Sequence, residues 1–220
     1  MYVGMFSLLA LLFCFLFFGK KVVVAALGIT KLSCTSILIS EICFWLILFL
    51  LSVYAKKIEK QNLLIWPETH YGFGMHLKSI FGIFGAIIVI SIPIVLALSF
   101  FHLVKESNKI NEMKTILQSN KQLLLFAAFT AGVTEEFMFR GYLLPRLELV
   151  FKSPFIAIAL SSIFFGLLHF SYGTIFNMVG PMILGGVFGY FYWKYRNIAI
   201  PIICHFLWDY VLMSVNVKPH

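Results

Sequence analysis

Apolar residues run along this chain in long blocks that are separated by short clusters of charged and polar residues. A helix that crosses a bilayer needs roughly 20 mostly apolar residues, and blocks of about this length recur along the whole chain. They predict seven spans, near residues 2–19, 35–55, 79–104, 122–144, 154–170, 176–193 and 197–215. The block 22–30 is too short to cross and would extend the first helix or lie in the interface, whereas another division of the chain gives eight spans. The pattern therefore predicts an all-α fold, a polytopic membrane helix bundle of about seven to eight spans.

Composition strengthens this prediction and removes other classes of protein. With 61% hydrophobic and 12% charged residues, the chain cannot be an ordinary water-soluble fold, and its spans leave no room for a large aqueous domain. The net charge is +8, but most basic residues flank the apolar blocks, where topology and anionic lipid account for them. We therefore expect the lipid bilayer as a partner and no nucleic acid.

The sequence also predicts the connecting loops, the start of one helix and a kink in another. The segments 56–78 and 105–121 are rich in Lys, Glu, Asn and Ser, and we expect them to be solvated loops. Ser153 followed by Pro154 is typical of a helix start, since serine caps the first turn and proline fits its first position. Pro93 predicts a kink in the third span.

Most charged residues lie in the predicted loops, and the exceptions cluster late in the chain. These intramembrane polar residues are Glu135, Glu136, Arg140, His169, His205 and Asp209. A charged group at the bilayer centre costs about 2.5–3.5 kcal/mol even on lenient scales, so we expect all of them to face the bundle interior. Glu41 is the one comparable residue upstream. It has no partner motif, and we expect it to have a structural or cavity role.

Helix spacing indicates how these side chains pair. Glu136 and Arg140 are i,i+4 neighbours and can neutralise each other on one face, whereas Glu135 is rotated by about 100° and lacks that partner. An unpaired carboxylate in an apolar setting suits a general base. His205 and Asp209 also share a face. Both pairs have a structural interpretation as well, as a buried ion pair and as a self-satisfied pair.

The motifs of other intramembrane hydrolases are missing. The chain has no H-E-x-x-H and no G-x-S-x-G, and its single aspartate, Asp209, excludes a two-aspartate protease. Glutamate, two histidines and an aspartate remain. Such a set could activate water and stabilise an oxyanion, or it could bind a metal such as zinc.

Three short motifs carry a family resemblance. Residues Glu135 to Arg140 resemble the E-E-x-x-x-R motif of the CPBP family, the CaaX proteases and bacteriocin-processing enzymes. Phe165 to His169 resembles the family's F-x-x-x-H, and His205 to Asp209 its H-x-x-x-N/D. The resemblance covers about residues 119–215, which we interpret as a catalytic helix core. Residues 1–118 would be N-terminal transmembrane helices and loops of the same integral membrane domain.

The resemblance implies an intramembrane endopeptidase of the CaaX-protease type. If this chain acts as that family does, Glu135 and His169 would activate water for attack on a peptide carbonyl. His205 and Asp209 would hold the oxyanion, and the pair of Glu136 and Arg140 would support the site. Zinc is possible, because the family is often described as metallopeptidase, and the sequence leaves metal dependence open. One departure is Asp209, because many members carry asparagine there and a carboxylate would repel an oxyanion.

The resemblance further implies a membrane-associated protein or peptide substrate. In a bacterial plasma membrane this would mean peptide maturation or bacteriocin immunity. The alternative is a non-enzymatic membrane protein, either a proton-coupled transporter or a catalytically silent family scaffold. A transporter should show repeats in both halves, whereas the intramembrane polar residues lie almost entirely in the last hundred residues. This asymmetry favours the enzyme.

Overall fold

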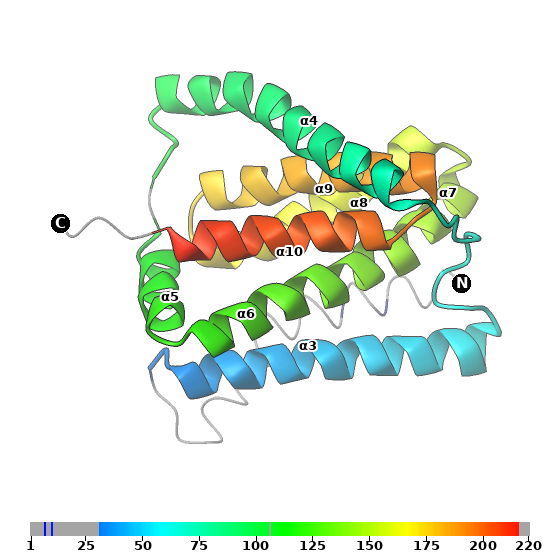
Figure 1. Cartoon of the computed structure of the whole chain (residues 1–220), viewed down its shortest axis with the longest axis horizontal. Coiled ribbons are helices and arrows are strands. Elements are labelled where there is room, and N and C mark those ends of the chain that lie inside the picture. Colours follow the sequence, from blue (N-terminus) through cyan, green and yellow to red (C-terminus); the bar gives the residue numbers. More distant parts are fainter. Residues whose placement is uncertain (1–6, 8–9, 11–30, 106, 216–220) are drawn as a thin grey trace.

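In the computed structural model, long helices lie side by side in one bundle (Figure 1). The structure describes residues 31–105 and 107–215, together with residues 7 and 10. This part of the chain contains no β-strand, so the predicted all-α class is confirmed. Apart from those two positions, the predicted span 2–19 and the short block 22–30 lie outside the described residues.

The described helices follow the predicted order. They are α3 (Cys34–Tyr54), η2 (Ala55–Glu59), α4 (Phe73–Phe100), α5 (Asn108–Ser119), α6 (Lys121–Thr130), η3 (Ala131–Glu135), η4 (Phe137–Leu143), α7 (Leu144–Phe151), α8 (Pro154–His169), η5 (Phe170–Tyr172), α9 (Phe176–Tyr195) and α10 (Ala199–Ser214). Four helical runs are long and apolar enough to cross a membrane, namely Cys34–Glu59, Phe73–Phe100, Lys121–Phe151 and Pro154–Tyr172. Helix α10 is apolar but shorter than these runs. Helix α9 corresponds to the predicted span 176–193.

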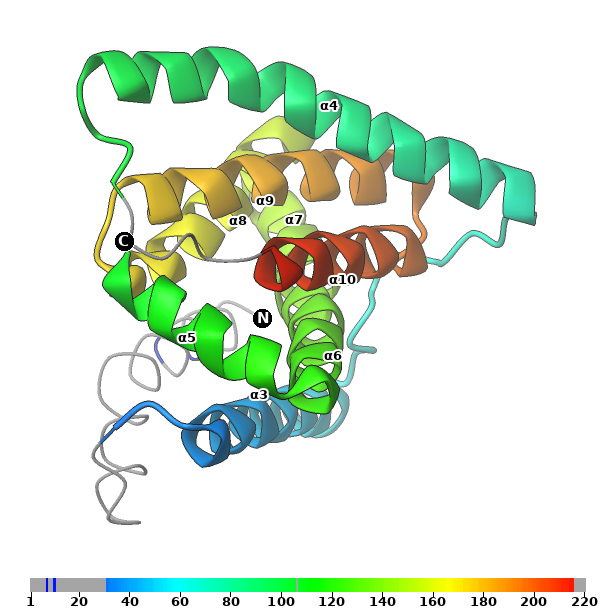
Figure 2. The ribbon, with the colours of Figure 1, turned by 60° about the vertical axis from the view of Figure 1, so that its left-hand side comes forward.

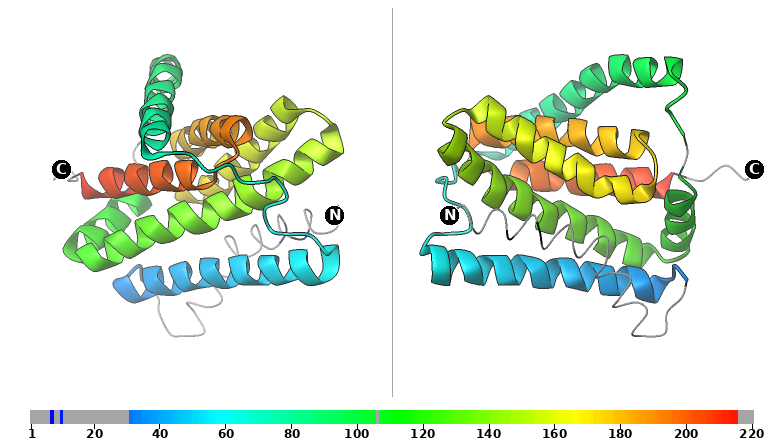
Figure 3. Two further views of the ribbon diagram at one scale, coloured as in Figure 1. Left: turned by 45° about the vertical axis from the view of Figure 1, so that its right-hand side comes forward. Right: turned by 180° about the vertical axis from the view of Figure 1, so that it is seen from behind.

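Helix α10 is the central element of the bundle. It contacts α4, α5, α6, η3 and α9, and it lies between α6 and α9 in Figure 1. Seen from behind, α8 and α9 form an antiparallel pair on one side, and α3 runs alongside α6 on the other (Figure 3). Polar residues in the middle of α10 are therefore enclosed by protein.

Helix α4 is the most exposed of the described spans. It contains Pro93 within one continuous helix, and its C-terminal part leans away from the bundle (Figure 2). Its outward side chains include Phe81, Val89 and Leu96, which are 69%, 71% and 65% exposed. Apolar side chains this exposed along a long helix fit contact with lipid.

Local sequence explains where several helices begin and end. Ser153 accepts a hydrogen bond from the backbone nitrogen of Ile156, and Pro154 occupies the first turn of α8, as predicted. Lys152 and Arg196 adopt left-handed backbone conformations, with φ of 51° at both, and end α7 and α9. These turns return the chain directly into α8 and α10.

The segment 56–78 is more than the solvated loop that we expected. Glu59 accepts hydrogen bonds from Arg146 Nη2 (2.7 Å) and from the Tyr142 hydroxyl (2.8 Å). Glu68 accepts one from the Tyr192 hydroxyl at 2.8 Å. Arg146 is only 1% exposed, and a buried guanidinium requires a counter-charge. Glu59, the last residue of η2, supplies that charge, and Glu68 links the connection to α9.

The expectation of a solvated loop at 105–121 is wrong, because this segment holds α5. Figure 2 shows α5 crossing one end of the bundle, from the turn between α8 and α9 to the start of α6. Ile110, Met113 and Leu117 line the bundle's inner cavity, while the polar residues lie between them in sequence. The i, i+3, i+7 spacing of these apolar residues is typical of one face of a helix, although most residues of the segment are polar.

Candidate active site

The two adjacent glutamates lie where the fourth predicted span departs from α-helical geometry. The run Lys121–Phe151 changes to π-helix in η3, which ends at Glu135, and again in η4, which begins after Glu136. Such widened turns are often found at functional sites. Glu135 lines the internal cavity, whereas Glu136 is fully buried and does not line it.

Glu136 is the centre of a buried polar network. Its Oε1 accepts a hydrogen bond from Arg140 Nη1 at 2.8 Å and a second from His205 Nδ1 at 2.8 Å. The Arg140 guanidinium lies over the ring of Phe165, 4.4 Å from its centroid, and 5.6 Å from that of Phe188. The predicted pairing of Glu136 with Arg140 is therefore confirmed, and the structure adds a link to α10.

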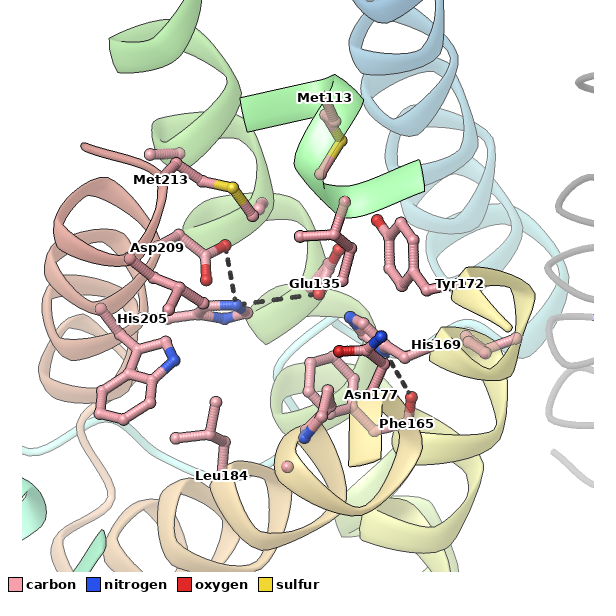
Figure 4. A pocket seen from close by; sticks show the side chains of 18 of the residues that line it. Met113, Glu135, Phe165, His169, Tyr172, Asn177, Leu184, His205, Asp209 and Met213 are labelled. Carbon is pink, nitrogen blue, oxygen red and sulfur yellow. Dashed lines mark hydrogen bonds and ion pairs between the residues drawn. The ribbon is translucent and has the colours of Figure 1, made fainter. Parts of the chain in front are cut away.

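His205 joins the two glutamates to Asp209. Because its Nδ1 bonds to a carboxylate oxygen that also accepts from Arg140, Nδ1 carries a hydrogen. The other ring nitrogen, Nε2, lies 3.5 Å from Asp209 Oδ2 and 3.9 Å from Glu135 Oε2. The predicted pairing of His205 with Asp209 is confirmed, but it is not self-contained. Figure 4 shows Glu135 between His205 on one side and His169 on the other.

His169 is oriented by its own helix. Its Nδ1 lies 2.8 Å from the backbone oxygen of Phe165, and a carbonyl can only accept, so Nδ1 carries the hydrogen. The ring packs on the Phe165 side chain with centroids 4.8 Å apart. In the neutral ring the Nε2 lone pair is left for a proton or a water molecule.

These side chains converge on one cavity of about 420 Å³. Its polar lining includes Glu135, His169, His205 and Asp209, so the expectation that these residues face the bundle interior is confirmed. Glu41 also lines it. The rest of the wall is mainly apolar and comes from α3, α4, α5, α8, α9 and α10. This volume and lining are typical of pockets that bind small or extended ligands.

A glycine on η3 allows α10 to reach the glutamates. A Cβ atom on Gly132 would lie 3.0 Å from the backbone nitrogen of Phe206 and 3.1 Å from the backbone oxygen of Ile202. Such distances are shorter than ordinary carbon contacts, so the two backbones meet here only because position 132 has no side chain. This close approach places His205 beside Glu135 and Glu136.

Comparison with known families agrees with this geometry. A family model described as "Type II CAAX prenyl endopeptidase Rce1-like" matches residues 118–211. This region of the chain is therefore similar to the CAAX protease family. The matched region contains all six predicted site residues. No curated protein and no solved structure matches the chain.

The match to a membrane-protease family, together with four long apolar helices in the described part of the chain, supports an integral membrane protein. Within it, the six site residues divide by their surroundings. Glu136, Arg140 and His205 are almost completely buried, whereas the side chains of Glu135 and Asp209 are 15% and 24% exposed. The first group can support the site, and the second can meet a substrate.

The donor arrangement bears on metal binding. Among the residues that the structure describes, no group of three or more His, Cys, Asp or Glu side chains is arranged to hold a metal ion. The Nδ1 atoms of both histidines bond to protein acceptors, so only their Nε2 atoms face the cavity as possible metal ligands.

Sequence reasoning missed several polar residues of the cavity wall. Lys109 on α5, Tyr172 on η5 and Asn177 on α9 all line the cavity. The Asn177 Nδ2 atom is buried and has no hydrogen-bond partner in the described part of the chain. These residues have no family motif. The packing of α9 against α8, and the contact of the start of α5 with η5, bring them to the site.

Proposed function

We propose that the protein is an intramembrane endopeptidase in which Glu135 and His169 activate a water molecule. The observation that carries this proposal is the division of the acid pair, with the Glu135 carboxylate at the cavity and Glu136 enclosed with Arg140. A base must reach the reacting water, whereas its support must be rigid and dry. The family match over residues 118–211 supports the reaction class.

The proposed step begins with water between the Glu135 carboxylate and His169 Nε2. Glu135 takes one proton as the water oxygen bonds to the peptide carbonyl carbon, and the carbonyl electron pair moves to its oxygen. The tetrahedral intermediate collapses with cleavage of the C–N bond, and the proton held by Glu135 passes to the leaving nitrogen. The products are a carboxylic acid and an amine, so the step balances without another reactant.

His205 is proposed to stabilise the oxyanion. Glu136 holds its Nδ1, which leaves Nε2 directed at the cavity, where a proton on Nε2 can be donated to the carbonyl oxygen. Asp209, 3.5 Å from Nε2 on the same helix, orients the ring. Donors already positioned where charge develops are worth more than donors that must move.

The substrate is proposed to be a membrane-associated peptide or protein. The cavity wall is mainly apolar, which suits a segment that carries a hydrophobic chain near the scissile bond. The family description names prenylated CAAX proteins, and these define the first substrate to test. We propose processing in a bacterial plasma membrane, including peptide maturation or bacteriocin immunity, as the setting.

The test uses the purified full chain in detergent with a farnesylated CAAX peptide, the same peptide without the farnesyl group, and a chelator control. We expect cleavage of the farnesylated peptide, located by the mass of the products, that persists when chelator is added. If folded wild-type protein leaves both peptides intact, the proposal fails and the non-enzymatic alternative is favoured. Activity that the chelator abolishes and zinc restores would contradict the metal-free step.

A substitution at Asp209 separates its two possible roles. Asparagine keeps the shape of the side chain and adds an amide donor, so Asp209→Asn should preserve or raise the rate of cleavage if this residue orients His205 towards an oxyanion. If Asp209 is instead a metal ligand, the change removes a charged ligand and lowers both activity and bound zinc. The cleavage rate and zinc content of the variant beside wild type are the measurements. Inactivation with loss of stoichiometric zinc would make Asp209 a ligand.

A further inference from the structure

Tyr172 lies at the site without belonging to any of the three motifs. It ends η5, three residues after His169, and its ring packs against the His169 ring with centroids 5.9 Å apart. Tyr172 lines the same cavity as Glu135 and His205. In Figure 4 its hydroxyl extends into the cavity on the side of Glu135 that is away from His205.

Residues at the start of α5 also contact Tyr172 and its neighbour Ser171. The Ser107 hydroxyl donates to the Tyr172 backbone oxygen at 2.7 Å, and Lys109 Nζ donates to the backbone oxygen of Ser171 at 3.1 Å. Lys109 Nζ also lies 5.4 Å from the centroid of the Tyr172 ring. These contacts from the start of α5 fix η5, so the phenol is positioned before any substrate binds.

The chemistry of the cavity gives this hydroxyl a role. Among the cavity-lining side chains closest to Glu135, Asp209 is a carboxylate, which cannot donate a hydrogen bond to an oxyanion when it is ionised. A phenol is a neutral donor, and it can stabilise a developing negative charge without bringing a second charge into an apolar cavity.

We propose, on the basis of the function proposed above, that Tyr172 is a further catalytic residue whose hydroxyl donates a hydrogen bond to the carbonyl oxygen of the substrate as it becomes an oxyanion. The oxygen would then be held from two sides, by His205 Nε2 and by the Tyr172 hydroxyl. No covalent bond to the tyrosine forms, and its proton stays on the phenol.

The test is Tyr172→Phe, which removes only the hydroxyl and keeps the ring against His169 and Lys109. The purified full chain is assayed on the farnesylated CAAX peptide over a range of concentrations. We expect kcat to fall by about 10²-fold, the usual effect of losing one oxyanion donor, with KM and the melting temperature unchanged. Tyr210→Phe is the matched control, because Tyr210 is 37% exposed and lies outside the cavity wall, and it should behave as wild type.

The possible outcomes separate this inference from the function on which it rests. If wild type does not cleave the peptide, the proposed endopeptidase function fails, and the inference fails with it. If wild type cleaves and Tyr172→Phe keeps its kcat, only the role of Tyr172 is refuted. A raised KM with unchanged kcat would also refute it, because the hydroxyl would then bind the ground state and the transition state equally.

Discussion

Replacing Glu135 with glutamine is expected to lower kcat for peptide cleavage by about 10²–10⁴-fold, because glutamine has the shape of glutamate but cannot accept the proton of the attacking water. The fold should be unaffected. Glu135 Oε2 has no hydrogen-bond partner among the described residues, and its nearest ion-pair partner is His205 Nε2 at 3.9 Å. The measurements are kcat on the farnesylated CAAX peptide and the melting temperature of the purified protein.

Two further variants complete this experiment. His169→Gln should lose activity to a similar extent, because it removes the second group that faces the water. Glu112→Gln is the matched control, since Glu112 is an exposed residue of α5 outside the cavity wall, and it should retain full activity. Normal turnover in Glu135→Gln would show that another group activates the water and would refute the proposed mechanism.

The second large effect is expected on stability. Replacing Arg140 with methionine should lower the free energy of unfolding by about 3–5 kcal/mol, because Glu136 would remain as a buried carboxylate without its cation. Methionine has a similar length and can keep the packing against Phe165 and Phe188. Denaturation of the purified protein, followed by helix content, measures this loss, and the yield of folded protein should fall with it.

Two comparisons identify the cause of that loss. Arg196→Met removes a cation that is 28% exposed, 4.0 Å from Glu148 and 3.4 Å from the centroid of the Trp66 ring, and it should cost less stability than Arg140→Met, because the carboxylate that it leaves is not fully buried. The double variant Glu136→Gln with Arg140→Met should regain part of the lost stability, because it leaves no buried charge unpaired. Wild-type stability of Arg140→Met alone would mean that the pair does not support the site.

The resemblance to the CAAX protease family depends on three short motifs, each of which lies within a single helix. The E-E-x-x-x-R, F-x-x-x-H and H-x-x-x-D spacings each place side chains on one helix face, and the structure has the corresponding contacts within each helix. The approximate spans could also be predicted from the apolar blocks, because a helix needs a minimum apolar length to cross a bilayer. In contrast, the expectation of a solvated loop at 105–121 is wrong, because it rests on the polar composition and not on the apolar face of α5.

Residue spacing along the chain is enough to predict the helical class, the approximate segments and the residues of each motif, because backbone hydrogen bonds fix which neighbours share a helix face. How the motifs meet depends on contacts between helices. The bond from His205 to Glu136 joins residues 69 positions apart, and it depends on the contact of α10 with η3 at Gly132. The division between Glu135 at the cavity and Glu136 in the interior, and the place of Tyr172 beside His169, also come from packing between helices. Such packing depends on the shapes of many side chains at once, which the spacing along one helix does not encode.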